Sequence, residues 1–368
     1  MAASRIYLDD AGSAPVLPEV AEALTHVPFG NPSSPHSEGR AARAALDRAR
    51  DLAARALGAQ RTEVTFVSSG TEAINLGLMG AAKRLQKRGV IATWAAEHQS
   101  VLATIRKLQS DGHACDIAAV DSGARADPDS IPRNAVLVSI GLANNEVGTI
   151  QPVADVIERA HSLGALVHID ACAGPRWMPV PAGADLVSIS GFKLGAGCGG
   201  VLLVKEGVRL EPLFLGGPQE WGRRAGREDV AVAVAIATAL VICKREREAR
   251  WVTAAAQSRV LREALLEVGA TPTGADRRLP NFASCTFADR RGEDLLMSLD
   301  LAGVAASSGS ACASGSLDPS HVLLATGMSL EQALGSLRLT TGYSTTGDEI
   351  ERACAIIRVK LARRRGHA

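Results

Sequence analysis

The sequence predicts an α/β fold in which a mainly parallel sheet of seven strands is flanked by helices and joined to a small α+β domain. Its 368 residues exceed the size of one typical domain. Between residues 35 and 205, amphipathic helical segments alternate with short apolar runs, which is typical of a parallel sheet covered on both faces. After a long helical segment the strands and helices become shorter, as expected for a separate small domain.

The large domain is expected to span residues 14–255. Ala, Leu and charged residues recur at helical spacing in four segments, 37–58, 70–89, 100–112 and 153–164. Seven runs rich in apolar and β-branched residues predict the strands, 64–69, 90–94, 115–120, 135–141, 166–171, 186–190 and 200–204.

The small domain is expected to combine residues 1–13 with residues 256–368. A long helix over 229–267 leads into it, and no Pro/Gly-rich linker marks the boundary near residue 255. Its expected elements are two strands and two helices, 282–288, 336–342, 293–303 and 347–364.

Composition restricts the classes of function and the compartment. Lys and Arg number 40 against 39 Asp and Glu, so charge gives no argument for nucleic acid or an anionic membrane as partner. No apolar run approaches the roughly 20 residues that span a bilayer, and no signal peptide is apparent, which predicts a cytoplasmic protein. The seven cysteines form no CxxC pair, so neither a disulfide framework nor a metal site is expected.

A phosphate site is predicted where a strand meets a helix, in the stretch SSGTEA at residues 68–73. Free backbone N–H groups at a helix N-terminus, together with Ser and Thr hydroxyls, bind phosphate. The alternative is an ordinary helix cap made by Ser69 or Thr71.

Two charged residues end neighbouring apolar strands. Asp170 ends LVHIDA and Lys193 follows LVSIS, so both should lie at the carboxyl edge of the parallel sheet, where ligands collect. A structural ion pair is the alternative, although desolvating two charges is costly. Pyridoxal phosphate (PLP) needs a phosphate site, a carboxylate for its pyridinium nitrogen and a lysine for an imine. His98, just after a strand, could stack on its ring, or it could be an ordinary surface histidine.

Cys312 stands in SSGSACASGS, residues 307–316, among nearly all Ser, Gly and Ala. Small residues bury little apolar area and glycines weaken helices, so the stretch predicts a mobile loop with an accessible thiol. Accessible thiols matter through thiolate chemistry. A surface turn with an incidental cysteine is the alternative.

The chain resembles the cysteine desulfurases, PLP enzymes of the class-V aminotransferase group with fold type I. The resemblance covers nearly the whole chain in ten ordered stretches: YLDDAGSAP, FGNPSSPHSEGRAAR, TFVSSGTEAINL, AAEHQSV, LANNEVGTIQP, HIDAC, SISGFK, LGGPQEWGRRAG, SSGSACASGSLDPSHVLLATG and SLRLTTGYSTTGDEI. It implies a homodimer that converts L-cysteine to L-alanine. The sulfur would be held as a persulfide and passed to an acceptor protein, which the sequence does not identify.

The resemblance also implies roles for single residues. Lys193 would form the imine and remove the substrate α-proton, Asp170 would pair with the pyridinium nitrogen, and His98 would stack on the ring and handle protons. Asn145 would donate to the ring hydroxyl, and Cys312 would attack the substrate sulfur. The implied phosphate ligands are Gly70, Thr71 and Ser190, and the substrate carboxylate would meet Arg338 with support from Asn31.

Four positions depart from the family pattern near the expected cofactor. Phe192 replaces a histidine before the lysine, and Ala173 replaces a glutamine three residues after Asp170. Arg227 stands where the neighbouring subunit usually supplies a threonine to the phosphate, and GAGCGG replaces a GPKG-like stretch. Each lost hydrogen bond is worth about 0.5–1.5 kcal/mol, so we expect a weaker or differently held cofactor. Farther along, Tyr343 replaces an arginine.

Two alternatives to a desulfurase remain open. A related PLP enzyme could cleave C–S or C–Se bonds, for example in selenocysteine, without needing Cys312. The second alternative is a degenerate scaffold that binds a partner and has no turnover. The altered residues Phe192, Ala173 and Arg227 support this alternative.

Overall fold

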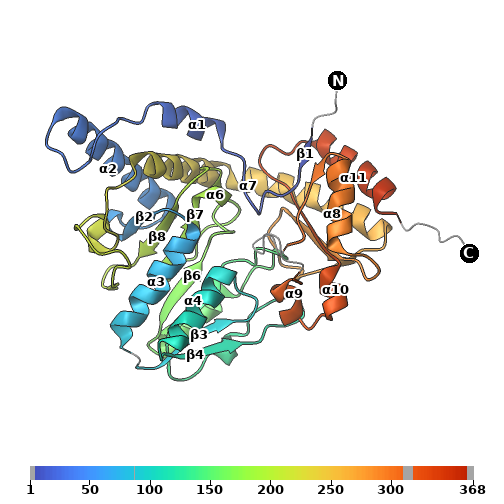
Figure 1. Cartoon of the computed structure of the whole chain (residues 1–368), viewed down its shortest axis with the longest axis horizontal. Helices are drawn as coiled ribbons and strands as arrows, with labels where there is room; N and C mark the ends of the chain where they lie inside the picture. Colours follow the sequence, from blue (N-terminus) through green and yellow to red (C-terminus); the bar gives the residue numbers. More distant parts are fainter. Residues whose placement is uncertain (1–4, 87, 310–317, 363–368) are drawn as a thin grey trace, which may run out of the picture.

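The computed structural model describes residues 5–86, 88–309 and 318–362. Its centre is a seven-stranded sheet in the order β2-β8-β7-β6-β5-β3-β4 (Figure 1). The strands are β2 (Val64–Val67), β3 (Val90–Trp94), β4 (Ala114–Ala118), β5 (Ala135–Gly141), β6 (Leu166–Asp170), β7 (Leu186–Ser190) and β8 (Gly200–Val204). The predicted seven strands and the mainly parallel sheet are therefore confirmed. One strand differs in direction, because β8 is antiparallel to both of its neighbours.

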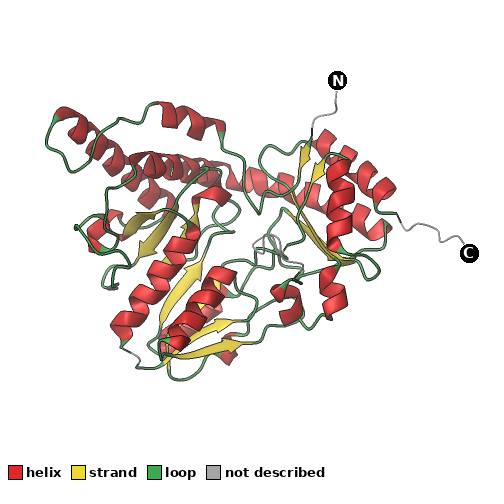
Figure 2. Ribbon diagram, viewed as in Figure 1, coloured by secondary structure: helices red, strands yellow, loops and turns green. Residues whose placement is uncertain are grey.

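Helices cover both faces of this sheet (Figure 2). Alternate strand residues such as Val187 and Ile189 pack into one core with α1 (Pro18–Thr25), α2 (Ser37–Leu57), α5 (Val153–Ser162) and α7 (Val230–Glu267). On the opposite face, Leu186 and Leu202 pack against α3 (Gly70–Leu85) and α4 (Gln99–Ser110). Two apolar cores of this kind are what an alternating βα sequence requires. The short helix α6 (Gly191–Leu194) directly follows β7, and single 3₁₀ turns lie at Arg61–Glu63, Pro128–Ser130 and Glu220–Gly222.

A second unit has its own apolar core. Its sheet has the order β12-β10-β9, from β9 (Thr271–Pro272), β10 (Phe282–Thr286) and β12 (Ser336–Thr340). The short strand β1 (Ile6–Tyr7) pairs with β11 (Val304–Ala305), so the chain start joins this unit. The unit's helices are α8 (Gly292–Leu301), α9 (His321–Ala325), α10 (Leu330–Leu334) and α11 (Gly347–Lys360).

Helix α7 connects the two units. Ala254 belongs to the core of the large sheet, whereas Leu261, two turns later, belongs to the core of the small unit. The division into residues 14–255 and residues 1–13 with 256–368 stays a prediction, since one continuous helix crosses its boundary.

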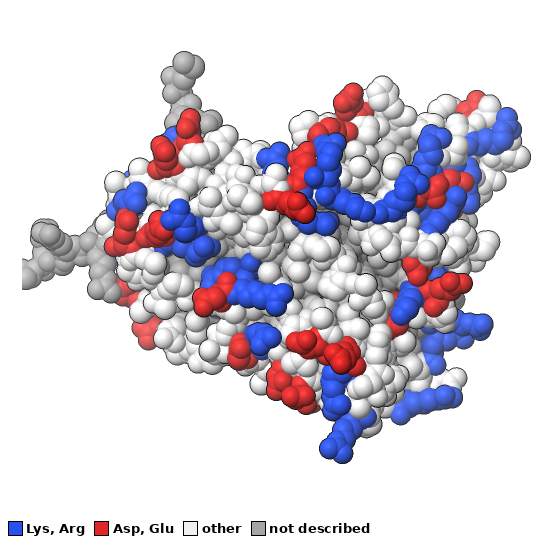
Figure 3. Space-filling model, turned by 180° about the vertical axis from the view of Figure 1, so that it is seen from behind, with Lys and Arg blue, Asp and Glu red and all other residues white. Residues whose placement is uncertain are grey.

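The surface agrees with the near-zero net charge. On the face shown in Figure 3, acidic and basic side chains are intermingled. Among the described residues, none of the helices combines the length and the hydropathy needed to cross a membrane.

A buried histidine links three adjacent strands of the large sheet, and its burial should make the stability of the fold sensitive to acid. His168 of β6 is fully buried, with Nδ1 2.9 Å from Ser139 Oγ of β5 and Nε2 2.8 Å from Ser188 Oγ of β7. Burial lowers the pKa of His168 to about 4. As the pH falls, His168 is therefore protonated in the unfolded chain before it is protonated in the folded one. The free energy of unfolding decreases for this reason as the pH falls from about 6.5 to about 4.

We expect the protonation of His168 to lower the free energy of unfolding by about 3 kcal/mol across this pH range. Urea unfolding of the wild type and of His168→Gln at pH 7, 6, 5 and 4 measures it, because glutamine does not titrate. The wild type should lose more stability with falling pH than the variant. Parallel losses in the two proteins would contradict the assignment.

Candidate active site

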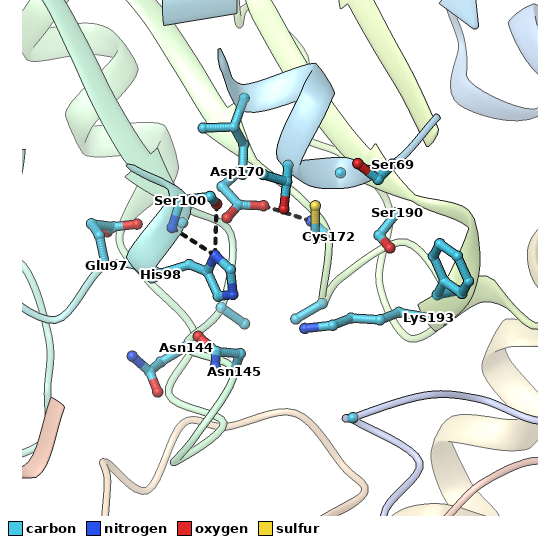
Figure 4. A pocket seen from close by; sticks show the side chains of 18 of the residues that line it. Ser69, Glu97, His98, Ser100, Asn144, Asn145, Asp170, Cys172, Ser190 and Lys193 are labelled. Carbon is cyan, nitrogen blue, oxygen red and sulfur yellow. Dashed lines mark hydrogen bonds between the residues drawn. The ribbon is translucent and has the colours of Figure 1, made fainter. Parts of the chain in front are cut away.

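Seven of the predicted site residues line one cavity of about 330 Å³ at the carboxyl edge of the large sheet. They come from the ends of five strands, β2, β3, β5, β6 and β7, and from the segments that follow them: Gly70, Thr71, His98, Asn145, Asp170, Ser190 and Lys193. In Figure 4 the side chains of His98 and Lys193 point toward the same space. Parallel strands present their carboxyl ends at one edge, which is why residues distant in sequence meet here.

The N-terminus of α3 forms one end of the cavity. Ser69 caps the helix, since its Oγ accepts a hydrogen bond from the backbone N–H of Glu72 at 3.1 Å. Gly70 cannot be replaced without movement, because an ideal Cβ there would lie 2.5 Å from Cys172 Sγ. Glycine at this position therefore lets α3 begin close to Cys172 and Ser190, and the N–H groups at this helix end favour a phosphate.

Asp170 and Glu97 place two buried carboxylates in the cavity wall. Asp170 Oδ1 accepts a hydrogen bond from the Cys172 N–H at 2.9 Å (Figure 4). Burial raises the pKa of Glu97 to about 8, a rise to which the charge of Asp170 also contributes. Glu97 is therefore mainly protonated at pH 7.

His98 is held in one tautomer. Its Nδ1 accepts a hydrogen bond from the backbone N–H of Ser100 at 3.1 Å, so the proton of the neutral imidazole is on Nε2. Burial lowers the pKa of His98, and the charge of Lys193 lowers it further against the opposing effect of Asp170. The cavity thus contains a neutral imidazole that donates from Nε2.

Asp170 and Lys193 do not form the structural ion pair considered as an alternative. In the described part of the chain, no salt bridge joins Asp170 to Lys193. The buried ion pairs there are made by arginines instead, and they join Arg50 to Glu220, Arg176 to Asp10 and Arg338 to Asp9. Lys193 instead extends from α6 into the cavity (Figure 4). An amine and a carboxylate at opposite parts of one cavity suit a ligand between them.

Arg338 lies beside the cavity rather than in its wall. The Arg338 guanidinium donates to the backbone oxygen of Asn145 at 2.8 Å and to Asp9 Oδ1 at 2.7 Å. Its Nε is buried and has no hydrogen-bond partner among the described residues. A buried donor without a partner destabilises the fold, and a carboxylate oxygen that reached Nε would supply the missing acceptor.

Besides Arg338, two predicted residues among the described ones do not line this cavity. Asn31 and Arg227 lie together in a second pocket, next to Phe29. Cys312 lies outside the described residues. No cluster of three or more potential metal ligands occurs in the described part of the chain.

Sequence reasoning missed five polar residues of the cavity wall, Glu97, Ser100, Asn144, Gln151 and Cys172. Glu97 and Cys172 stand next to predicted residues in AAEHQSV and HIDAC, and that adjacency was the available signal. Gln151 does not replace the glutamine missing at Ala173, because its amide is bonded to the backbone of Ala124 and Ala126.

Known proteins have sequences and folds similar to those of this chain. The family model for class-V aminotransferases matches residues 6–353. The chain belongs to the class-V aminotransferase family. The chain is 37% identical over 361 residues to the cysteine desulfurase IscS of Dictyoglomus turgidum. The aligned residues cover 94% of this chain and 91% of that relative.

Solved class-V relatives share the whole fold. A NifS-like protein superposes with a TM-score of 0.89 at 30% identity, covering 96% of this chain and 99% of that structure. SspA, solved in complex with cysteine, matches with a TM-score of 0.80 at 29% identity, covering 91% of this chain and 98% of that one. The α/β fold of type I and the resemblance to cysteine desulfurases are thereby confirmed.

Proposed function

We propose that this chain is a PLP-dependent cysteine desulfurase, which converts L-cysteine to L-alanine and holds the sulfur as a persulfide on Cys312. The observation that supports it most is the single cavity lined by Lys193, Asp170 and His98 beside the N-terminus of α3. Its curated relatives are named cysteine desulfurases, and SspA was solved with cysteine.

The cavity residues fit PLP. The α3 amides at Gly70 line the cavity and would bind the phosphate together with Thr71 and Ser190. Asp170 would hold the ring nitrogen protonated, and Asn145 would meet the ring hydroxyl. When bound, PLP supplies an electron-accepting ring that stabilises negative charge on the substrate α-carbon.

The protein's own side chains would bind the substrate and move its protons. Arg338 would bind the substrate carboxylate through its guanidinium, including the buried Nε. Lys193 Nζ would take the α-proton, while His98, neutral and protonated on Nε2, would donate a hydrogen bond into the cavity.

Sulfur transfer would then follow at Cys312. Its thiolate attacks the substrate sulfur, so an S–S bond forms while the C–S bond breaks. The electron pair of the C–S bond stays on the substrate β-carbon, which takes a proton to give alanine. The persulfide remains on the protein for transfer to an acceptor protein.

We further propose a cytoplasmic homodimer. Asn31 and Arg227 would then serve the neighbouring subunit, because both lie in the second pocket and away from Lys193 of their own chain. The Arg227 guanidinium would supply positive charge to the partner's phosphate site.

We expect weak retention of PLP, because Phe192 and Ala173 line the cavity without offering the hydrogen bonds usual in the family. Purified protein should contain less than one PLP per chain. Restoring the glutamine with Ala173→Gln should tighten PLP binding about two- to tenfold, the effect of one hydrogen bond. Equilibrium titration measures it, with Ala173→Met as a control of similar size. Equal affinities for both variants would contradict the explanation.

The proposed function is tested by the absorbance spectrum of the purified protein before and after addition of PLP and L-cysteine, with alanine and sulfide assayed in the same tube. A cofactor band that shifts with cysteine, together with alanine, supports a desulfurase. Binding of PLP with turnover of selenocysteine but not of cysteine supports the alternative lyase. Neither band nor alanine, even with excess PLP, would contradict the proposal and support a partner-binding scaffold.

A further inference from the structure

Glu146 lies on the turn ANNEVG directly after Asn145, yet it does not line the cavity and is buried. Its backbone is fixed on both sides. The Glu146 N–H donates to Asn144 Oδ1 at 2.9 Å, and its carbonyl oxygen accepts from Ser284 Oγ of β10 at 2.8 Å. The carboxylate therefore has a defined position between the two units of the fold.

This carboxylate accepts a hydrogen bond from the C-terminal described flank of the segment that contains Cys312, and it lies beside the N-terminal one. On the N-terminal side, an ideal Cβ on Gly309 would lie 3.3 Å from Glu146 Oε2, and Gly309 has a left-handed φ of +86° that favours glycine. On the C-terminal side, the Ser320 hydroxyl donates to Glu146 Oε2. Ser320 is itself fully buried and caps α9, since its Oγ accepts from the Leu323 N–H.

His321, the next residue, connects α9 to the turn that carries His98. Its Nε2 lies 2.8 Å from the backbone oxygen of Glu97, and its Nδ1 lies 2.9 Å from Gln99 Nε2. The Gln99 amide nitrogen can only donate, so His321 accepts at Nδ1 and donates from Nε2. Both neighbours of His98 are thus bonded to one side chain of α9.

Apolar packing reinforces these contacts. Val322 and Leu323 of α9 form a small core with Ala96 and Val147, which flank the turns of His98 and Asn145. In Figure 1, α9 lies between the large sheet and α10. The N-terminal flank is also fixed, because Ser307 exchanges two backbone hydrogen bonds with Arg338.

From these contacts we propose that Glu146 and His321 are positioning residues for sulfur transfer. Their hydrogen bonds fix the C-terminal described flank of the Cys312 segment to the turns that present His98 and Asn145, and Glu146 also lies beside Gly309 on the N-terminal flank. This inference rests on the proposed desulfurase function. Neither side chain would touch substrate, and their effect would be on the step in which the Cys312 thiolate meets the substrate sulfur. A misplacement of about 1 Å at a reacting group can cost about a hundredfold in rate.

The test compares Glu146→Ala, Glu146→Gln and His321→Phe with the wild type, and uses Glu331→Gln, on exposed α10, as a control of equal charge change. Glu146→Ala and His321→Phe should lower kcat for alanine about 10- to 100-fold. The KM for cysteine and the affinity for PLP should stay within about twofold. In Glu146→Gln, kcat should fall less than in either of these variants, because the glutamine amide oxygen can still accept the hydrogen bond from Ser320.

A second readout does not depend on turnover. Alkylation of Cys312 by iodoacetamide, followed by mass spectrometry, should be severalfold faster in Glu146→Ala and unchanged at Cys115, because an unanchored segment samples more conformations. Unchanged kcat and alkylation in Glu146→Ala would overturn the inference, as would a fall in kcat that merely follows loss of PLP. If the wild type forms no alanine, the proposed function fails, and the alkylation rates still decide whether Glu146 positions the segment. If Glu146→Ala does not fold, Glu146→Gln and His321→Phe provide the same two readouts.

Discussion

Replacing Cys312 by serine is expected to lower alanine formation from L-cysteine by at least about a thousandfold, because a serine hydroxyl is not a nucleophile toward sulfur at neutral pH. The cofactor absorbance should still change when cysteine is added, since Lys193, Asp170 and Arg338 remain in place. Steady-state alanine assays and spectral titration measure the two effects. Substitution of another partly exposed cysteine, Cys115→Ser, is the matched control and should keep full activity.

The same variant separates the two enzymatic alternatives. A lyase that releases its product directly has no need of Cys312, so Cys312→Ser would keep turnover on its preferred substrate. Full alanine formation by Cys312→Ser would therefore contradict the desulfurase mechanism while leaving the PLP site intact.

Lys193→Ala is expected to have the second large effect. The substitution removes both the amine that would attach PLP and the group that would take the α-proton. Loss of a positioned general base alone costs about 10²–10⁴-fold. Alanine formation should fall at least that far, and PLP should be lost on gel filtration. Cofactor absorbance after desalting and the alanine assay measure the two losses.

Lys205, which follows the neighbouring strand β8, provides the control for Lys193. Its side chain is about half exposed and lies 3.9 Å from Asp185, away from the cavity. Lys205→Ala should therefore retain both PLP and activity. Retention of tightly bound PLP and turnover by Lys193→Ala would show that the cavity works by another chemistry.

Much of the fold could be predicted because apolar runs specify strands that are buried on both faces. β5 and β7 have the predicted limits, and β6 ends one residue earlier. The antiparallel direction of β8 could not be predicted, since an apolar run has the same pattern in either direction. Helix α3 ends at Leu85 rather than at residue 89, because Gln86 adopts a left-handed conformation. Helices α9 and α10 are too short for a periodic signal.

The cavity could be predicted where residues follow strands at the carboxyl edge, as Asp170 and Lys193 do. Glu97 was missed because its raised pKa arises from burial and from Asp170, which are tertiary effects. Glu146 was missed for a similar reason, since its contacts to Gly309 and Ser320 join residues more than 150 positions apart in the sequence. The place of Asn31 and Arg227 in a second pocket also depends on tertiary structure.

The central claim is that sulfur leaves cysteine onto Cys312. The most direct measurement is mass-spectrometric mapping of the PLP-loaded wild type after incubation with L-cysteine without acceptor or reductant, with alanine counted in the same sample. We predict one persulfide on Cys312 for each alanine formed in the first turnover, and none on Cys115, Cys172 or Cys198. Alanine formation with an unmodified Cys312, or a persulfide on another cysteine, would contradict the account.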